Sequence, residues 1–152
     1  MRSREILQEA QAVMFQNYRS FPLVIARGEG CRVWDADGNR YLDLVAGIAV
    51  VNLGHCHPVV VRAVRDAAGR LFHISNLYVN ESAVKLARWL VDHSFADRVF
   101  FCNSGTEAVE AAIKLLRRHA WATGRKHARK IVVAENGFHG RTMGALSATI
   151  QA

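Results

Sequence analysis

Ser104, Gly105 and Thr106 form the stretch of the sequence whose residue types are best suited to hold a phosphate group. The first turn of a helix leaves backbone N–H groups without partners and carries partial positive charge. A turn of small residues lets an anion approach that backbone, and hydroxyl groups add further donors. Glycine at position 105 also permits backbone conformations that larger side chains resist. The turn therefore predicts a phosphate site, although simple capping of the helix by Ser104 or Thr106 explains the same residues.

The turn does not match the two common glycine-rich nucleotide motifs. It lacks the lysine and the spacing of a P-loop, and its glycine does not fit the dinucleotide fingerprint. Neither kind of nucleotide site is therefore indicated.

A second candidate cluster lies at residues 137–142, directly after an apolar segment. In α/β folds, ligands bind at the C-terminal ends of the strands. Phe138 offers a ring face to a flat aromatic cofactor, and Arg141 can bind a carboxylate through paired hydrogen bonds. The alternative places Phe138 in the core and Arg141 on the surface. Together with the phosphate turn, the cluster is what an enzyme that handles amino acids with pyridoxal phosphate (PLP) requires.

The elements around these residues indicate an α/β fold. Residues 98–101 and 131–134 are short apolar segments typical of buried strands, and residues 106–123 between them have the pattern of a helix. Strand, helix and strand in this order predict a parallel pair with a crossover helix. The helix is expected to bury Ala108, Ala111, Ala112, Leu115 and Leu116 and to stop near Gly124.

The remaining elements follow from local signals. A hairpin is expected at 31–34 and 40–44, around the turn 35–39. Helices are expected at 4–16, from Pro58 to about 71, after a cap at Asn80, and from 141 or 142 onward. The helix after Asn80 should bury Ala83, Leu86, Ala87, Leu90 and Val91.

Composition excludes several classes of protein. The chain has 152 residues, of which 51% are hydrophobic and 22% charged, as in ordinary globular proteins. No apolar run approaches a membrane span, and the polar N-terminus lacks a secretory signal, so a soluble cytoplasmic protein is expected. Cys31, Cys56 and Cys102 indicate no disulfide framework. His55 and His57 flank Cys56 too closely to chelate as a set, so no metal is expected.

The formal net charge of +7 raises the possibility of nucleic-acid binding. The excess lies between residues 114 and 130, in a stretch without any acid. This pattern equally suits the exposed end of a helix and the turn after it, where cations complement the helix dipole. Because no nucleic-acid motif accompanies it, no nucleic-acid partner is expected.

From Tyr18 onward the sequence resembles the class III aminotransferases. The resemblance is carried by residues 41–43, 46–50, 52–58, 75–78, 101–108 and 138–142, in order and at the family's spacing. It implies a PLP-dependent transferase of fold type I, similar to aspartate aminotransferase. Residues 1–58 would belong to the small domain. Residues 59–152 would form the first part of the PLP-binding large domain, with the start of its parallel sheet.

The resemblance also implies roles for individual residues. Ser104, Gly105 and Thr106 would hold the PLP phosphate. Phe138 would stack on the pyridine ring, with His139 also at the cofactor. Arg141 would bind the substrate α-carboxylate, and Tyr18 would lie near the substrate.

The family reaction passes an amine from a donor to PLP and then to 2-oxoglutarate. Ornithine-specific members carry a tyrosine where this chain has Ile48, which favours N-acetylornithine as donor, in arginine biosynthesis. Ornithine, succinyldiaminopimelate and 4-aminobutyrate remain alternative donors. The family also implies a homodimer.

Two departures from the family pattern limit these implications. Val109 stands where the family usually has asparagine, with a modest effect expected on the turn. No lysine here matches the family's Schiff-base lysine, so no catalytic residue is assigned and the chain alone is expected to be inactive. The lysines are Lys85, Lys114, Lys126 and Lys130. A chain that lacks the rest of the fold should expose apolar surface and self-associate. A non-catalytic fragment that binds phosphate or PLP is the alternative.

Overall fold

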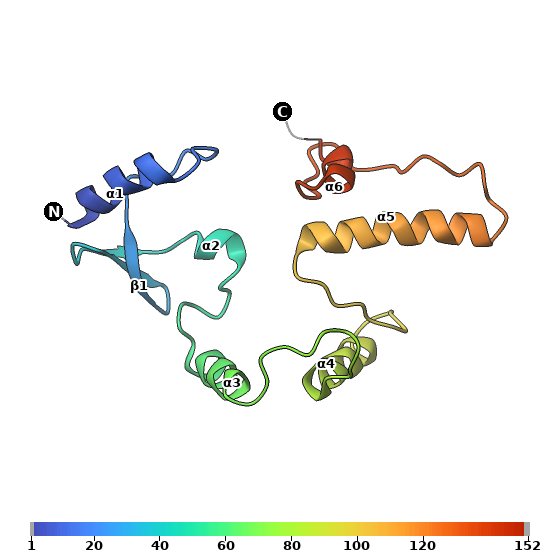
Figure 1. The fold of residues 1–152 in the computed structure, drawn as a ribbon, viewed down its shortest axis with the longest axis horizontal. Coiled ribbons are helices and arrows are strands. Elements are labelled where there is room, and N and C mark those ends of the chain that lie inside the picture. Colours follow the sequence, from blue (N-terminus) through green and yellow to red (C-terminus); the bar gives the residue numbers. More distant parts are fainter. Residues whose placement is uncertain (1, 151–152) are drawn as a thin grey trace. The chain divides into compact units, whose positions relative to one another are not determined.

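The computed structural model describes residues 2–150, which divide after Tyr78 into two compact units (Figure 1). The first unit holds a small sheet and three helices, and the second holds three further helices. The predicted phosphate turn and the cluster at 137–142 both lie in the second unit.

The first unit is built on an antiparallel sheet in the order β1-β2-β3. Its strands are β1 (Ile25–Glu29), β2 (Arg32–Asp35) and β3 (Arg40–Leu42). The predicted hairpin is confirmed as β2 and β3, with Val33 opposite Tyr41. Val33 is buried, whereas β1 was not predicted and adds a third strand beside β2.

Asp35 closes the hairpin turn. Its carboxylate accepts hydrogen bonds from Asn39 N (2.8 Å), Asn39 Nδ2 (2.9 Å), Asp37 N (3.0 Å) and the Tyr41 hydroxyl (2.8 Å). These bonds, with the Asn39 side chain contributing most, lower the pKa of Asp35 below 3.8. A buried carboxylate with this many donors is satisfied as the charged form, so it fixes the turn at pH 7.

The helices of the first unit are α1 (Arg2–Val13), α2 (Ala46–Ala49) and α3 (Pro58–Ala68). Helix α1 lies slightly upstream of the predicted 4–16, and α3 starts at Pro58 as predicted. Element α2 is a single turn with positive φ at Ala46 (51°), Gly47 (64°), Ile48 (60°) and Ala49 (60°). This is a left-handed turn, which costs L-residues about 1–2 kcal/mol each.

In the second unit, α4 (Glu81–Asp92) begins at the predicted cap. The Asn80 side chain accepts a hydrogen bond from Ala83 N at 3.2 Å. The predicted stripe is confirmed in part: four of its members are half-buried, namely Ala83, Ala87, Leu90 and Val91. Leu86 is 49% exposed.

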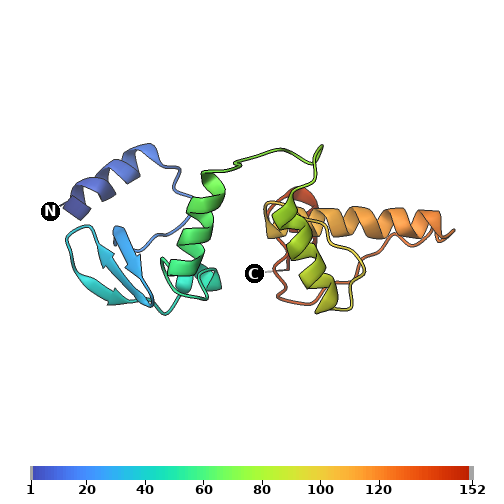
Figure 2. The same ribbon diagram turned by 90° about the horizontal axis from the view of Figure 1, so that it is seen from below.

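Helix α5 (Gly105–Ala122) ends before Gly124, where φ is +76°, and α6 (Met143–Ala148) follows as the last helix. The segment after α5 returns to the N-terminal end of that helix, where α6 packs against it (Figures 1 and 2). Ala145 and Ala148 of α6 are buried. The sequence therefore brings residues 104–106 and 137–142 to the same end of α5.

The expected strands at 98–101 and 131–134 are wrong for this structure. Neither segment pairs with another among residues 2–150, so no parallel pair is formed there. A strand needs a neighbour for its backbone groups, and Phe100 (72% exposed) and Val132 (96%) have no covering layer. For the same reason the predicted interior of α5 is wrong: Leu115 and Leu116 are 70% and 55% exposed, Ala108 and Ala112 are exposed, and Ala111 is half-buried.

Exposed apolar surface is confirmed in both units. Phe72 is 91% exposed and Phe95 is fully exposed. Within residues 2–150, no helix has both the length and the apolar character that crossing a membrane requires.

Candidate functional site

The turn at residues 104–106 is an N-cap in the structure. Ser104 has an extended backbone (φ −151°, ψ 161°), and its Oγ accepts a hydrogen bond from Glu107 N at 3.3 Å. Glu107 in turn accepts from Asn103 N at 2.6 Å, so that the residue before the cap is held too. Capping of the helix by Ser104 is thus confirmed.

The turn keeps donors available beyond the cap. Gly105 and Thr106 occupy the first two helical positions, whose N–H groups have no partner inside the helix. Within residues 2–150 no acceptor is bonded to either group, and none is bonded to the Ser104 hydroxyl. A Cβ added to Gly105 would meet no atom within 4 Å, so the space beside this residue of the turn is open. These donors at the positive end of an 18-residue helix suit a phosphate.

The loop 137–142 is fixed to α6 by Thr149. The Thr149 hydroxyl accepts a hydrogen bond from His139 N at 3.0 Å and lies 3.2 Å from the carbonyl oxygens of Gly140 and Ala145. Ile150 N donates to the Gly137 carbonyl at 3.0 Å. The first part of the loop that carries Phe138 and Arg141 is therefore tied to the two residues that follow α6.

Thr106 joins the phosphate turn to this loop. Its Oγ1 lies 2.9 Å from Thr142 Oγ1 and accepts a longer bond, 3.4 Å, from Thr142 N. Gly140 is buried at φ +128°, and a Cβ there would collide with the Thr106 hydroxyl. Glycine is therefore required at 140 both for the backbone conformation and for the close approach.

The side chains of Phe138 and Arg141 lie near each other on the loop. Phe138 is 57% exposed, so the alternative that places it in the core is wrong. The Arg141 guanidinium carbon lies 6.0 Å from the centre of the Phe138 ring, at the limit of a cation–π contact. His139 between them is half-buried. An aromatic face and a cation thus lie on one loop, beside the open turn.

Tyr18 and Ile48 belong to the first unit and are not among the residues that the second unit brings together. Tyr18 is 59% exposed and Ile48, in the left-handed turn α2, is 88% exposed. Each is accessible on its own unit.

Glu110 and Thr149 also shape the site, although the sequence predicted no role for either residue. Thr142 was predicted as the last residue of the cluster at 137–142 and as a possible helix start, without a role of its own. Glu110 follows Thr106 by four residues, which places both on one face of α5. That spacing was the available signal for Glu110, whereas nothing in the local sequence indicates the contacts of Thr149.

The basic residues lie where the sequence predicted an exposed helix end. They are Lys114, Arg117, Arg118, Arg125, Lys126, Arg129 and Lys130, all exposed. Lys126 rests over the Trp121 ring, with Nζ 4.6 Å from its centre. Among the described residues, no three His, Cys, Asp or Glu side chains are grouped as a metal site would need.

Comparison with known proteins shows the family to which the chain belongs. Residues 13–152 match the family described as aminotransferase class-III. The acetylornithine aminotransferase of Caldanaerobacter subterraneus is 52% identical over 138 residues, which are 91% of this chain and 35% of that protein. The chain thus spans about a third of the length of the curated relatives it matches.

Solved structures agree with the fold. An ornithine aminotransferase from Toxoplasma gondii, described with partial occupancy of PLP at its active site, superposes with a TM-score of 0.92 at 32% identity, over 98% of this chain and 35% of that one. The acetylornithine aminotransferase from Elizabethkingia anophelis superposes with a TM-score of 0.82 at 34% identity, over 89% of this chain and 36% of that one. These likenesses confirm the predicted fold class, that of the PLP-dependent aminotransferases, for this chain. This chain belongs to the class III aminotransferases.

Proposed function

We propose that this chain is the N-terminal part of a PLP-dependent aminotransferase that transfers the amino group of N-acetylornithine to 2-oxoglutarate, in arginine biosynthesis. The observation that carries the proposal is the bond between Thr106 and Thr142, which holds an open phosphate turn beside an aromatic ring and an arginine. The names of the relatives, acetylornithine aminotransferases at about half identity, support the amino donor.

Each residue of the site has a separate task in this proposal. The Ser104 hydroxyl and the N–H groups of Gly105 and Thr106 bind the cofactor phosphate. The Phe138 ring stacks on the pyridine ring, and His139 lines the cofactor beside it. Arg141 binds and orients the substrate α-carboxylate. PLP, when bound, supplies the electron-withdrawing ring on which amino transfer depends.

We assign no catalytic residue within this chain. Lys85 forms an ion pair with Glu81, and Lys126 covers Trp121. Lys114 lies near Glu110, and Lys130 is exposed. The cofactor-binding lysine is therefore expected elsewhere in the protein, and residues 1–152 alone should bind PLP reversibly without turnover.

Ornithine is the second candidate donor, because the ornithine aminotransferase of Toxoplasma gondii matches the fold closely. Ile48 favours N-acetylornithine, since an aliphatic side chain replaces the tyrosine of ornithine-specific members. We further propose that Tyr18 contacts the substrate, that the protein is a cytoplasmic homodimer, and that residues 1–58 and 59–152 belong to the small and large domains. The unpaired thiols of Cys31, Cys56 and Cys102 support a reducing compartment.

The test compares amino donors in the full-length protein. We expect the highest kcat/KM with N-acetylornithine when ornithine, succinyldiaminopimelate and 4-aminobutyrate are offered in turn with 2-oxoglutarate. A higher kcat/KM for another of these donors would show that N-acetylornithine is not the preferred amino donor. Purified residues 1–152 should bind PLP that dialysis removes, and a borohydride-stable PLP adduct with turnover would overturn the assignment of no catalytic lysine.

A further inference from the structure

Glu110 of α5 accepts hydrogen bonds both from Thr142, at the end of the loop that carries Arg141, and from the first turn of α6. Its Oε1 accepts hydrogen bonds from Thr142 Oγ1 (2.6 Å), Gly144 N (2.9 Å) and Ala145 N (3.1 Å). The Thr142 hydroxyl contributes most to lowering the pKa of Glu110 below 4.5, followed by the Ala145 amide. Glu110 is therefore a carboxylate at pH 7, and it only accepts hydrogen bonds.

The contacts with the first turn of α6 show that the approach of Glu110 is specific. Thr142 caps α6 without a side-chain bond to that helix, and the Glu110 carboxylate takes over the orphan amides. A Cβ on Gly144 would collide with the Glu110 carboxylate. Glycine at 144 is thus a condition for the contact, as glycine at 140 is for the approach of Thr106.

The carboxylate also decides the direction of the hydroxyl bonds. Thr142 has one hydroxyl proton, and the bond to Glu110 uses it. The Thr142 oxygen therefore accepts in its bond with Thr106, so the Thr106 hydroxyl donates to Thr142 at 2.9 Å. With its proton engaged there, the Thr106 side chain does not donate to a phosphate. The donors left to a phosphate are the Ser104 hydroxyl and the backbone N–H groups of Gly105 and Thr106.

We propose that Glu110 is a positioning residue, which orients Thr142 and Thr106 and thereby sets the Arg141 loop against the phosphate turn. This inference rests on the proposed function and adds two specific statements to it. The Thr106 side chain serves carboxylate binding through the loop rather than phosphate binding. Glu110 affects substrate binding through the position of Arg141 and does not itself contact the substrate.

The experiment uses the full-length protein loaded with PLP. Loss of a charge-assisted hydrogen bond should loosen the loop, so Glu110→Ala should raise the KM for 2-oxoglutarate about tenfold or more, with a smaller change in kcat. Glu110→Gln keeps an acceptor oxygen and should recover most of that loss. Glu81→Ala, on the exposed surface of α4, is the matched control. Equal KM values in all four proteins would overturn the proposal.

A double-mutant cycle separates positioning from simple capping of α6. Thr142→Val should reproduce much of the KM effect of Glu110→Ala, and the two together should be far from additive. Additive effects would mean that Glu110 acts only through the amides of α6, which contradicts the proposal.

Cofactor binding gives an independent readout. By equilibrium dialysis, Thr106→Val should change the PLP dissociation constant by less than about threefold, whereas Ser104→Ala should raise it about tenfold. A tenfold rise in the PLP dissociation constant of Thr106→Val would mean that the Thr106 hydroxyl binds the phosphate, and it would overturn the inference. If the unaltered protein binds no PLP, the proposed function itself fails, and this outcome is distinct from the others.

Discussion

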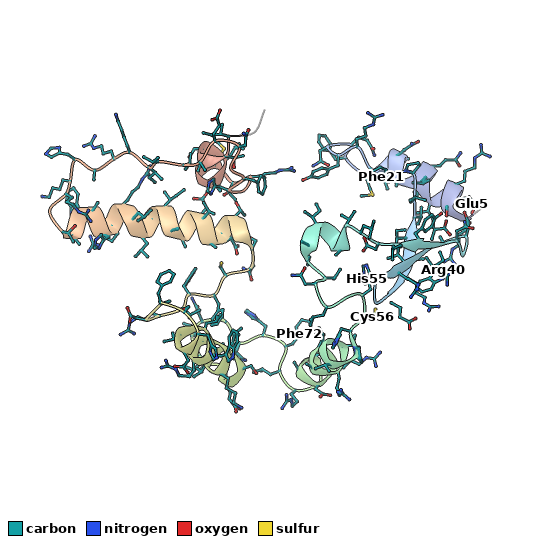
Figure 3. The ribbon with its side chains drawn as sticks, turned by 180° about the vertical axis from the view of Figure 1, so that it is seen from behind. Glu5, Phe21, Arg40, His55, Cys56 and Phe72 are labelled. Atoms are coloured by element: carbon teal, nitrogen blue, oxygen red, sulfur yellow. The ribbon has the colours of Figure 1, made fainter. Side chains whose placement is uncertain are left out.

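His55 Nε2 lies 2.7 Å from Asp43 Oδ2, and this pair holds the segment before α3 against the sheet. The other oxygen of Asp43 accepts from Val45 N (2.8 Å) and Ala46 N (2.9 Å), at the entrance of the left-handed turn α2. His55 also pairs its backbone with Gly30, and its ring lies beside the sheet at Gly28 (Figure 3). One carboxylate thus connects the sheet, the turn that presents Ile48 and the segment that leads to α3.

The Asp43 carboxylate should titrate below its usual pKa of 3.8. The bond to His55 is the largest cause of the lowered pKa, followed by the amides of Ala46 and Val45. Because the folded-state pKa is depressed, the stabilisation is present above pH 3.8 and is lost as the pH falls through the lower folded-state value. Carboxyl NMR titration of residues 1–152 would measure it. His55→Ala should raise the midpoint, whereas His57→Ala should leave it unchanged; a midpoint at or above 3.8 in the unaltered chain would contradict the assignment.

Gly54→Ala should destabilise the first unit more than Gly38→Ala. Both glycines have positive φ, +87° and +91°, so both substitutions incur about 1–2 kcal/mol of backbone strain. A Cβ at 54 would lie 2.9 Å from Gly30 Cα, whereas a Cβ at 38 meets open space. The collision should add about 1–3 kcal/mol. In urea unfolding, Gly54→Ala should have the lower midpoint, and equal midpoints would show that the backbone approach relaxes freely.

Asn80→Ala should cost α4 about 1 kcal/mol, because the Ala83 amide loses its acceptor. Asn80→Asp keeps that acceptor and serves as the control. Hydrogen exchange at the Ala83 amide would measure the effect. Exchange that is no faster in Asn80→Ala than in Asn80→Asp would mean that water replaces the cap at no cost.

Ile48→Tyr should change which amino donor the full-length protein prefers. Ile48 is 88% exposed on its unit, so a larger ring fits without displacing a neighbour there. We expect the ratio of kcat/KM for ornithine to that for N-acetylornithine to rise about tenfold or more. Val50→Tyr, two residues further on and also exposed, controls for a general effect of added bulk. A ratio that changes equally in both variants would remove Ile48 from the specificity-determining residues.

Local signals predicted the local structure well. Pro58, Asn80 and Ser104 each start a helix where the sequence placed one, since caps act over only a few residues. The turn of the β2–β3 hairpin was equally visible, because Asp35 binds donors within six residues. The phosphate turn and the loop of Arg141 were predicted separately from their residue types.

Features that depend on distant partners were not predictable in the same way. The strands at 98–101 and 131–134 were inferred from apolar content, but a strand exists only where a neighbour accepts its hydrogen bonds. The left-handed turn at 46–49 depends on Asp43 and His55, which no propensity encodes. The bond between Thr106 and Thr142 joins residues that are 36 positions apart, and only the three-dimensional structure reveals it.

The turn closed by Asp35 bears on the order in which the chain folds. Its four hydrogen bonds connect residues no more than six positions apart, so closing the turn orders little chain. Hairpins of this kind form in about 1–10 μs, far faster than a ribosome adds the next residue. The β2–β3 hairpin can therefore be complete while later segments are still being synthesised, and it offers β1 an ordered edge on which to assemble.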